Sequence, residues 1–327
     1  MPLHDVGYRA WTGATVSPWL RWWVIATVGI RIALRSTWLG RTLILSAVPA
    51  IGFGVIFFVY EQSITQPELR QAIANMVTVA GGTQPMIQAA ITDPVAARHE
   101  IWSALLLAFF RYPQTVLLLV VVGLVAPRLI SYDLRNKGYL LYFSRPIQPW
   151  EYILGKSVIV WFFIAVITTM PAILLYIIGL SLSSDVTVVA ATWDLPLRVV
   201  ASSFLLMVPT TALALACSAL TIESRNAVFA WFAVWLVGWV TYGVLTSGAV
   251  IEAEQRRHRG FGVPQAYSFV SRWELLSPYH LLGRVQQWIF GLFPEDHSVL
   301  PYLSILLVTT VLCLLFIYRQ LRARMVA

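Results

Sequence analysis

The sequence predicts an all-α integral membrane protein with six transmembrane helices and with both termini in the cytoplasm. Its 327 residues are 58% apolar and only 12% charged, whereas soluble domains carry about 25% charged residues. A soluble enzyme is therefore excluded. Six apolar stretches are each long enough to cross a hydrocarbon core of about 30 Å as a helix. The predicted spans lie at about 42–60, 113–130, 155–180, 197–220, 226–249 and 299–318.

The distribution of the basic residues gives the orientation. With the N-terminus inside, the inner segments carry 14 of the 23 basic residues and 4 of the 15 acidic ones. Short loops rich in Arg and Lys stay on the cytoplasmic side of a membrane. The net charge of +8 is thereby explained by topology, so nucleic-acid binding is disfavoured.

The N-terminal region, residues 1–41, precedes a single transmembrane domain, residues 42–327. Residues 19–39 alternate apolar side chains, including Trp22 and Trp23, with three arginines. This pattern predicts an amphipathic helix. Two placements remain open: the membrane interface, where arginines reach lipid phosphates, or the cytoplasm, packed against the spans.

The two long outer loops, 61–112 and 250–298, are predicted to contain broken helices. The first loop holds three prolines and a Gly-Gly pair, which divide it into short helices, and its apolar segment 101–110 suggests a separate interfacial helix. The second loop has two helix-like pieces divided at Ser277 and Pro278, just before the last span. These pieces fit a re-entrant element or an amphipathic lid equally well.

Pro49, Pro171 and Pro209 lie within spans one, three and four. Each removes a backbone donor and predicts a kink. Neighbouring hydroxyls can satisfy the carbonyls that a proline frees. The candidates for this role are Thr168, Thr169, Thr210 and Thr211.

An ATP site on this chain is not expected. Gly155, Lys156 and Ser157 resemble the end of a phosphate-binding loop, but that loop needs a glycine five residues before Gly155, and Trp150 stands there. No cofactor and no metal are therefore predicted for the chain. Ionisable residues are also absent from the middles of the predicted spans, which disfavours an ion-coupled carrier.

The inner loop 131–151 gathers charges of both signs around aromatic residues, and Pro146 and Pro149 impose turns on it. Such a surface suits docking of a protein. A plain basic interfacial loop is the alternative.

This loop resembles the permease subunit of type-2 ATP-binding-cassette (ABC) exporters. The runs that carry the likeness are Leu129-Ile130-Ser131-Tyr132-Asp133, Ser144-Arg145-Pro146-Ile147 and Tyr152-Ile153-Leu154-Gly155-Lys156, with Leu275-Leu276-Ser277-Pro278 before the last span and Glu223-Ser224-Arg225-Asn226-Ala227 in the other inner loop. The amphipathic connecting helix and the six spans extend the resemblance over most of the chain. The long N-terminal extension and the large first outer loop depart from minimal members.

The resemblance implies a coupling site, partners and a location. Two separate ABC ATPase subunits would hold ATP and Mg²⁺, and a second permease chain, identical or related, would complete the pathway in a bacterial cytoplasmic (inner) membrane. The coupling helix of the family maps onto residues 131–151. The residues expected to couple to the ATPase are Asp133, Arg135, Asn136, Lys137, Ser144, Arg145, Pro146, Glu151, Glu223 and Arg225.

Span five carries a candidate substrate pathway. Trp231, Trp235 and Trp239 repeat at a spacing of four residues beside Phe232, which makes one aromatic stripe on a helix. The stripe faces either an apolar or amphiphilic substrate or neighbouring helices and lipid. The absence of charge at mid-span favours a hydrophobic or amphiphilic substrate.

Two other functions remain as alternatives. An integral-membrane lipid-modifying enzyme could use His280, or the cluster Glu295, Asp296 and His297, as an acid-base group at the outer interface, although no second catalytic residue converges on either. A non-transporting membrane assembly subunit is the other alternative.

Overall fold

Long helices make up most of the computed structural model, which describes Ser17 and residues 20–79, 84–138, 147–183, 187–258, 273–294 and 297–326. No β-strand occurs within these ranges. Six helices are long and apolar enough to cross a membrane, and each overlaps one predicted span, so the predicted all-α fold with six spans is confirmed. They run over Thr37–Thr65, Arg98–Arg135, Pro149–Leu182, Thr187–Leu220, Ser224–Ser247 and Leu300–Ala323.

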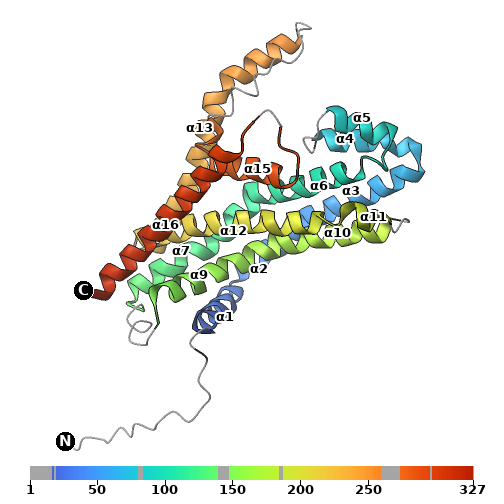
Figure 1. Ribbon diagram of the computed structural model, residues 1–327. Helices are drawn as coiled ribbons and strands as arrows, with labels where there is room; N and C mark the ends of the chain where they lie inside the picture. Colours follow the sequence, from blue (N-terminus) through green and yellow to red (C-terminus); the bar gives the residue numbers. More distant parts are fainter. Residues whose placement is uncertain are drawn as a thin grey trace, which may run out of the picture.

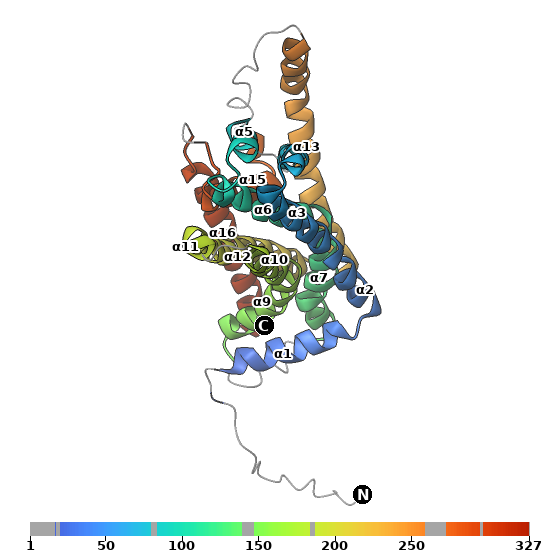
Figure 2. The same ribbon diagram turned by 90° about the vertical axis from the view of Figure 1, so that its right-hand side faces the viewer.

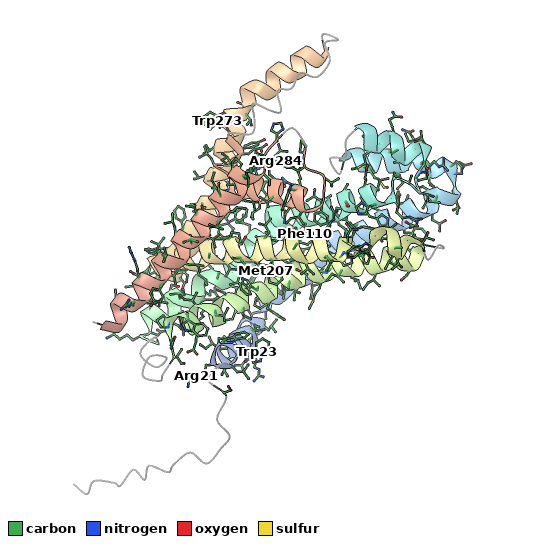
Figure 3. The ribbon with its side chains drawn as sticks, viewed as in Figure 1. Arg21, Trp23, Phe110, Met207, Trp273 and Arg284 are labelled. Carbon is green, nitrogen blue, oxygen red and sulfur yellow. The ribbon has the colours of Figure 1, made fainter. Side chains whose placement is uncertain are left out.

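The N-terminal helix α1 (Arg21–Leu34) runs crosswise under the ends of the long helices (Figure 2). It packs against α9 (Pro149–Ile164). A Cβ on Gly155 of α9 would stand only 2.8 Å from the carbonyl oxygen of Trp22, so the two backbones approach closely. The opposite face of α1 is apolar and exposed, and Trp23 on it lies at the edge of the bundle (Figure 3).

The first span is a helix broken once, into α2 (Thr37–Leu45) and α3 (Ala47–Thr65). Pro49 lacks a backbone N–H, and its ring clashes with the carbonyl four residues earlier, which is that of Leu45. The break falls at Ser46 for this reason. The helix is interrupted one turn before Pro49, and the span begins at Thr37, earlier than predicted.

The first outer loop folds as predicted into short helices: η2 (Pro67–Leu69), α4 (Arg70–Val79) and α5 (Gln84–Thr92). The hydroxyl of Tyr60 donates to the carbonyl of Pro94 at 2.6 Å. Arg98 pairs with Glu61 at 3.1 Å, and both side chains are buried. These contacts fasten the helical outer segment to the ends of the long helices.

The prediction of a separate interfacial helix over 101–110 is wrong. α6 (Arg98–Pro113) continues through a π-helical turn, Gln114–Leu118, into α7 (Leu119–Arg135). Every residue from 101 to 110 is buried. A local π-helical adjustment is one way in which membrane helices tolerate proline, so Pro113 does not end the helix.

This continuous helix has two consequences. Its 38 residues measure about 57 Å at 1.5 Å per residue, which exceeds the bilayer core and requires the helix to tilt or to project beyond it. The helix also contains Arg111, which lay just outside the predicted second span. Arg111 lies over the ring of Tyr279, 4.6 Å from its centroid.

The third span consists of α9, a π-helical turn over Ala165–Thr169, and α10 (Met170–Leu182). The π-helical turn precedes Pro171, as expected for a helix that accommodates proline. Thr168 donates to the carbonyl of Ile164 at 2.8 Å. Thr169 instead donates to Ser203 Oγ on α12 (Leu195–Leu220) at 2.8 Å. The carbonyl four residues before Pro171 is that of Ile167, so neither of these hydrogen bonds reaches the carbonyl that the proline frees.

The fourth span joins α11 (Thr187–Thr192) to α12 (Leu195–Leu220), which continues past Pro209 as one helix. The hydroxyls of Thr210 and Thr211 are buried without a hydrogen-bond partner among the described residues. They do not satisfy the carbonyl freed by Pro209. Met207 on α12 and Phe110 on α6 lie inside the main core (Figure 3).

The last two spans are α13 (Ser224–His258) and α16 (Leu300–Val326), with α15 (Pro278–Ile289) between them (Figure 1). α13 extends beyond the predicted end of span five, so the start of the predicted outer loop is helical. α15 begins at the predicted break at Pro278. It contacts α6, α12, α13 and α16 and buries Leu281, Leu282 and Val285. It therefore packs into the bundle and does not lie over it as a detached lid.

Candidate functional site

One end of the bundle brings together five helices and most of the predicted coupling residues. At this end α7 and α16 stop, α9 begins, and α12 meets α13 (Figure 1). We call it the basic end, because its exposed ionisable residues are mainly arginine and lysine: Arg128, Arg135, Lys137, Arg225, Arg319 and Arg322. A small apolar core holds it together, formed by Ile130, Leu134, Tyr152, Leu215, Ala216, Ala219, Ile317 and Leu321.

Asp133 lies inside the basic end and bonds to two residues of α9. Its Oδ2 accepts from the Lys156 ammonium at 2.8 Å and from the Tyr152 hydroxyl at 2.7 Å. The Asp133 and Lys156 side chains are 14% and 9% exposed, so the pair is largely desolvated. The Lys156 ammonium also lies 5.3 Å from the centroid of the Tyr152 ring. These contacts fix the end of α7 to the first turns of α9.

The two helix ends that flank the connection are separately closed. At the end of α7, the Gly138 N–H donates to the Asp133 carbonyl at 2.8 Å, and Lys137 adopts the left-handed conformation with φ 53°, as in a Schellman motif. At the start of α9, Glu151 Oε2 accepts from the Gln148 N–H at 2.8 Å. Ser144, Arg145 and Pro146 lie outside the described residues.

Three serines join α7 to α12 and α13 through hydrogen bonds that the sequence analysis did not predict. Ser218 Oγ accepts from the Ile130 and Ser131 N–H groups, at 3.0 and 3.1 Å, and donates to the Pro127 carbonyl at 2.8 Å. Ser131 Oγ lies 2.8 Å from Ser224 Oγ. Pro127 cannot donate inside α7, and its position in a helix was the one sequence signal for an unusual hydrogen-bond arrangement here.

The predicted coupling residues fall into two groups by exposure. Asp133 and Glu151 are directed into the structure. Asp133 bonds to Lys156 and Tyr152 of α9, and Glu151 accepts from the backbone N–H of Gln148, just before α9. The other described members are exposed at the surface of the basic end, and their side chains are free to meet a partner there: Arg135, Asn136, Lys137, Glu223 and Arg225.

The predicted aromatic stripe does not stay on one surface. Trp231 is fully buried, and its indole N–H donates to the Leu119 carbonyl at 2.9 Å, next to the π-helical turn. Trp235 is also buried, and its ring meets that of Trp231 edge-on at 5.5 Å. Phe232 packs beside Gly123 of α7. Trp239 is 56% exposed. Two of the three tryptophans are therefore buried, and Trp231 bonds to the backbone of α7.

At the opposite end, His280 is held in a half-buried stack. Its ring lies on that of Tyr242 with centroids 3.6 Å apart, and its Nδ1 is 2.9 Å from Ser277 Oγ. Burial, with a further contribution from the Arg111 cation, lowers the His280 pKa to about 4. Ser277 is fully buried, so the Ser277–His280 pair is not a surface nucleophile.

A partly buried ion pair lies beside this stack. Arg284 on α15, labelled in Figure 3, bonds to both carboxylate oxygens of Glu274, at 2.6 and 2.7 Å. Within the described ranges no group of three His, Cys, Asp or Glu residues could hold a metal ion. Glu295 and Asp296, which the sequence reasoning grouped with His297, lie outside the described residues.

Six membrane-spanning helices, a crosswise N-terminal helix and a braced basic end define a multi-pass membrane subunit of the transporter type. Residues 23–321 match the family model of the ABC-2 family transporter proteins, and the chain belongs to that family. It is a permease component of an ABC transporter, and ABC ATPase subunits are its partners. A search of curated proteins finds no match.

Proposed function

We propose that the chain is the permease subunit of an ATP-driven exporter for a hydrophobic or amphiphilic substrate. Two permease chains, identical or related, form the pathway, and two separate ATPase subunits bind ATP and Mg²⁺. Membership of the ABC-2 family supports the transporter assignment. The largely uncharged spans support an apolar substrate, since a charge costs about 2.5 to 3.5 kcal/mol at the centre of a membrane helix.

The brace formed by Asp133, Lys156 and Tyr152 is the observation that carries this proposal. A push on a loop moves the helices that it joins only if the loop is fixed to both of them. Asp133 belongs to α7, and its two partners belong to α9, so both ends of the connection move together. When ATP closes the ATPase dimer, a push on residues 131–151 would therefore move α7 and α9 as one unit.

The exposed coupling residues on the two inner loops of the basic end, from Arg135 to Lys137 and from Glu223 to Arg225, then form the contact with the ATPase. Arg135 and Lys137 lead into the connection between α7 and α9, and Arg225 begins α13 on the neighbouring inner loop. The three serine hydroxyls hold these two loops in one unit, because Ser131 of α7 bonds to Ser224 of α13. A partner that touches both loops would therefore act on α7, α9 and α13 at once.

The basic end faces the cytoplasm in this proposal, and the membrane is a bacterial cytoplasmic membrane. The excess of exposed arginine and lysine at this end agrees with the positive-inside rule. The apolar exposed face of α1 lies at the same end of the bundle and fits the headgroup boundary.

The pathway would follow α7 and α13 and be completed by the second permease chain. Phe232 and Trp239 remain its candidate lining residues. The outer face of α13 around Trp239 holds a hollow of about 370 Å³. Trp231 and Trp235 would support this wall from behind by packing against α7.

Charge reversal of the exposed pair tests the proposal. We expect Arg135→Glu with Lys137→Glu to weaken the affinity for the cognate ATPase subunit by about tenfold or more, since like charges at a contact are costly. The measurement is co-purification together with a titration of the ATPase against the permease in nanodiscs. Glu68→Lys is the matched control, because Glu68 is an exposed charge near the opposite end. An affinity unchanged in the double variant would refute the docking assignment.

A further inference from the structure

An apolar groove runs along the outside of the bundle between α9 and α16, with α12 as its floor. Its volume is about 480 Å³, which lies in the range of small-molecule sites, about 300 to 1,000 Å³. Leu154 of α9 and Leu314 and Leu315 of α16 form its walls, and Ala212 lies in the floor. We call it the α9–α16 groove. α1 packs on the other side of α9, around Gly155, and leaves the groove open.

The groove begins at the basic end and reaches about one leaflet into the bundle. Trp150, in the first turn of α9, and Trp161 both line it. They are eleven residues apart, which is about 16 Å along a helix. Half of a hydrocarbon core of about 30 Å is about 15 Å. The length of the groove therefore matches one lipid acyl chain that enters from the leaflet at the basic end.

The mouth of the groove has the chemistry of the headgroup boundary. Trp150 and Tyr318 line the mouth and are partly exposed, and such aromatic side chains concentrate at membrane interfaces. Arg322 follows Tyr318 by four residues on α16, so it continues the same helix face one turn further out. Its side chain is exposed, and a guanidinium binds phosphate through charge-assisted hydrogen bonds.

We propose that the α9–α16 groove binds one anionic phospholipid, with an acyl chain between α9 and α16 and with its phosphate at Arg322. The site is separate from the ATPase contact and from the pathway along α13. It lies on α9, which carries the brace to Asp133, so a bound lipid would stabilise α9 against α12 and α16. This inference rests on the proposed function in one respect only: the lipid belongs to the cytoplasmic leaflet if the basic end faces the cytoplasm.

A second copy of the chain is a poorer occupant than a lipid. A symmetric contact across this groove would bring the arginines of one basic end against those of another, and like charges at an interface are costly. The groove is also only one leaflet deep, whereas a packed transmembrane helix would need a complementary surface along its whole length. Both features fit a phospholipid that places one acyl chain in the groove and its phosphate at the basic end.

Photocrosslinking from a lipid acyl chain tests the site. The purified full-length permease is placed in nanodiscs that contain phosphatidylglycerol with a diazirine in one acyl chain, and crosslinked peptides are mapped by mass spectrometry. We expect crosslinks to concentrate on the groove residues of α9 and α16. Leu315→Trp, which fills the groove from its exposed rim, should reduce them about tenfold. Leu312→Trp is the control, because Leu312 is an exposed residue of α16 that does not line the groove.

The headgroup is tested by competition between two lipids. We expect Arg322→Gln to lower the preference for phosphatidylglycerol over phosphatidylcholine about fivefold, since one arginine near a lipid surface contributes about that factor. Crosslinks spread evenly over all apolar faces, or unaffected by Leu315→Trp, would show ordinary surrounding lipid and overturn the proposal. Crosslinks between two permease chains through the groove would show a second copy as the occupant and also overturn it. Either result leaves the affinity for the ATPase, and so the proposed function, untouched.

Discussion

Asp133 and Lys156 lie on either side of the connection between α7 and α9 and are both nearly buried. Removing one partner of a buried ion pair leaves the other charge desolvated, at a cost of about 3 to 5 kcal/mol. We therefore expect Asp133→Asn to lower the free energy of unfolding by about that amount. Thermal or denaturant unfolding in detergent measures it, with Asp133→Asn/Lys156→Gln as the second variant.

The double variant shows whether the lost stability comes from the unpaired charge of Lys156 or from a general loss of packing. If Lys156 is the source of the cost, the double variant regains most of the lost stability, because no buried charge remains. Glu68→Gln serves as the control for removal of an exposed acid. An effect of Asp133→Asn no larger than that of Glu68→Gln would show that the brace contributes nothing to stability.

The sequence indicated Asp133 as a coupling residue through its place in a charged inner loop, but it did not indicate that the side chain points inward. The partners Tyr152 and Lys156 are 19 and 23 residues away, and only the antiparallel return of α9 brings them within reach. The sequence contained even less indication of the serine contacts, since Ser218 lies 88 residues from Ile130. Contacts of this kind depend on tertiary packing, which hydropathy and spacing do not describe.

At the scale of elements, the close approach of α1 to α9 depends on glycine. A methyl group at Gly155 would stand 2.8 Å from the Trp22 carbonyl oxygen and from Ile25 Cβ. Because one of these neighbours is backbone, α1 must move away. Overpacking of this kind typically costs about 1 to 3 kcal/mol. We expect Gly155→Ala to destabilise the protein and to increase hydrogen exchange across α1.

Gly52 provides a matched control for this change. It is also a helical glycine, but nothing lies within 4 Å of a Cβ placed there. Alanine in an open helical position stabilises a helix by about 0.8 to 1 kcal/mol relative to glycine. Gly52→Ala should therefore stabilise the protein slightly and leave hydrogen exchange of α1 unchanged. Equal exchange in α1 for wild type and Gly155→Ala would show that the contact does not hold α1.

The six spans could be predicted because each requires about 20 apolar residues, and that signal is contained within each segment. Their ends were less predictable. Residues 101–110 were separated from the second span because Arg111 and Pro113 interrupt the apolar run, yet the helix continues through both. Arg111 is accommodated by Tyr279 and by the absence of a side chain at Gly283 of α15. This compensation comes from a segment far along the chain, so local sequence did not reveal it.

At the scale of the whole molecule, the two ends of the bundle have different polar chemistry. The basic end is fastened by Asp133 and Lys156 and by serine hydroxyls. The opposite end is fastened where α6, α13, α15 and α16 meet, by the partly buried Glu274–Arg284 pair and by the stack of His280 on Tyr242. Hydrogen bonding to Glu274 raises the pKa of Arg284, so the guanidinium stays charged at physiological pH. His280 in the same region can take up a proton when the pH falls.

Acid should therefore loosen this end of the molecule first. His280 has a pKa of about 4 in the folded protein, against 6.5 for the unperturbed group, so the unfolded chain takes up a proton at a higher pH. Stability from this residue is complete above about pH 6.5 and is lost as the pH falls towards 4. We expect the melting temperature to fall over this window, with hydrogen exchange rising in α15 before it rises in α7 and α9. His280→Phe keeps an aromatic ring on Tyr242 but cannot titrate. The same loss of melting temperature in that variant would assign the acid sensitivity to other groups.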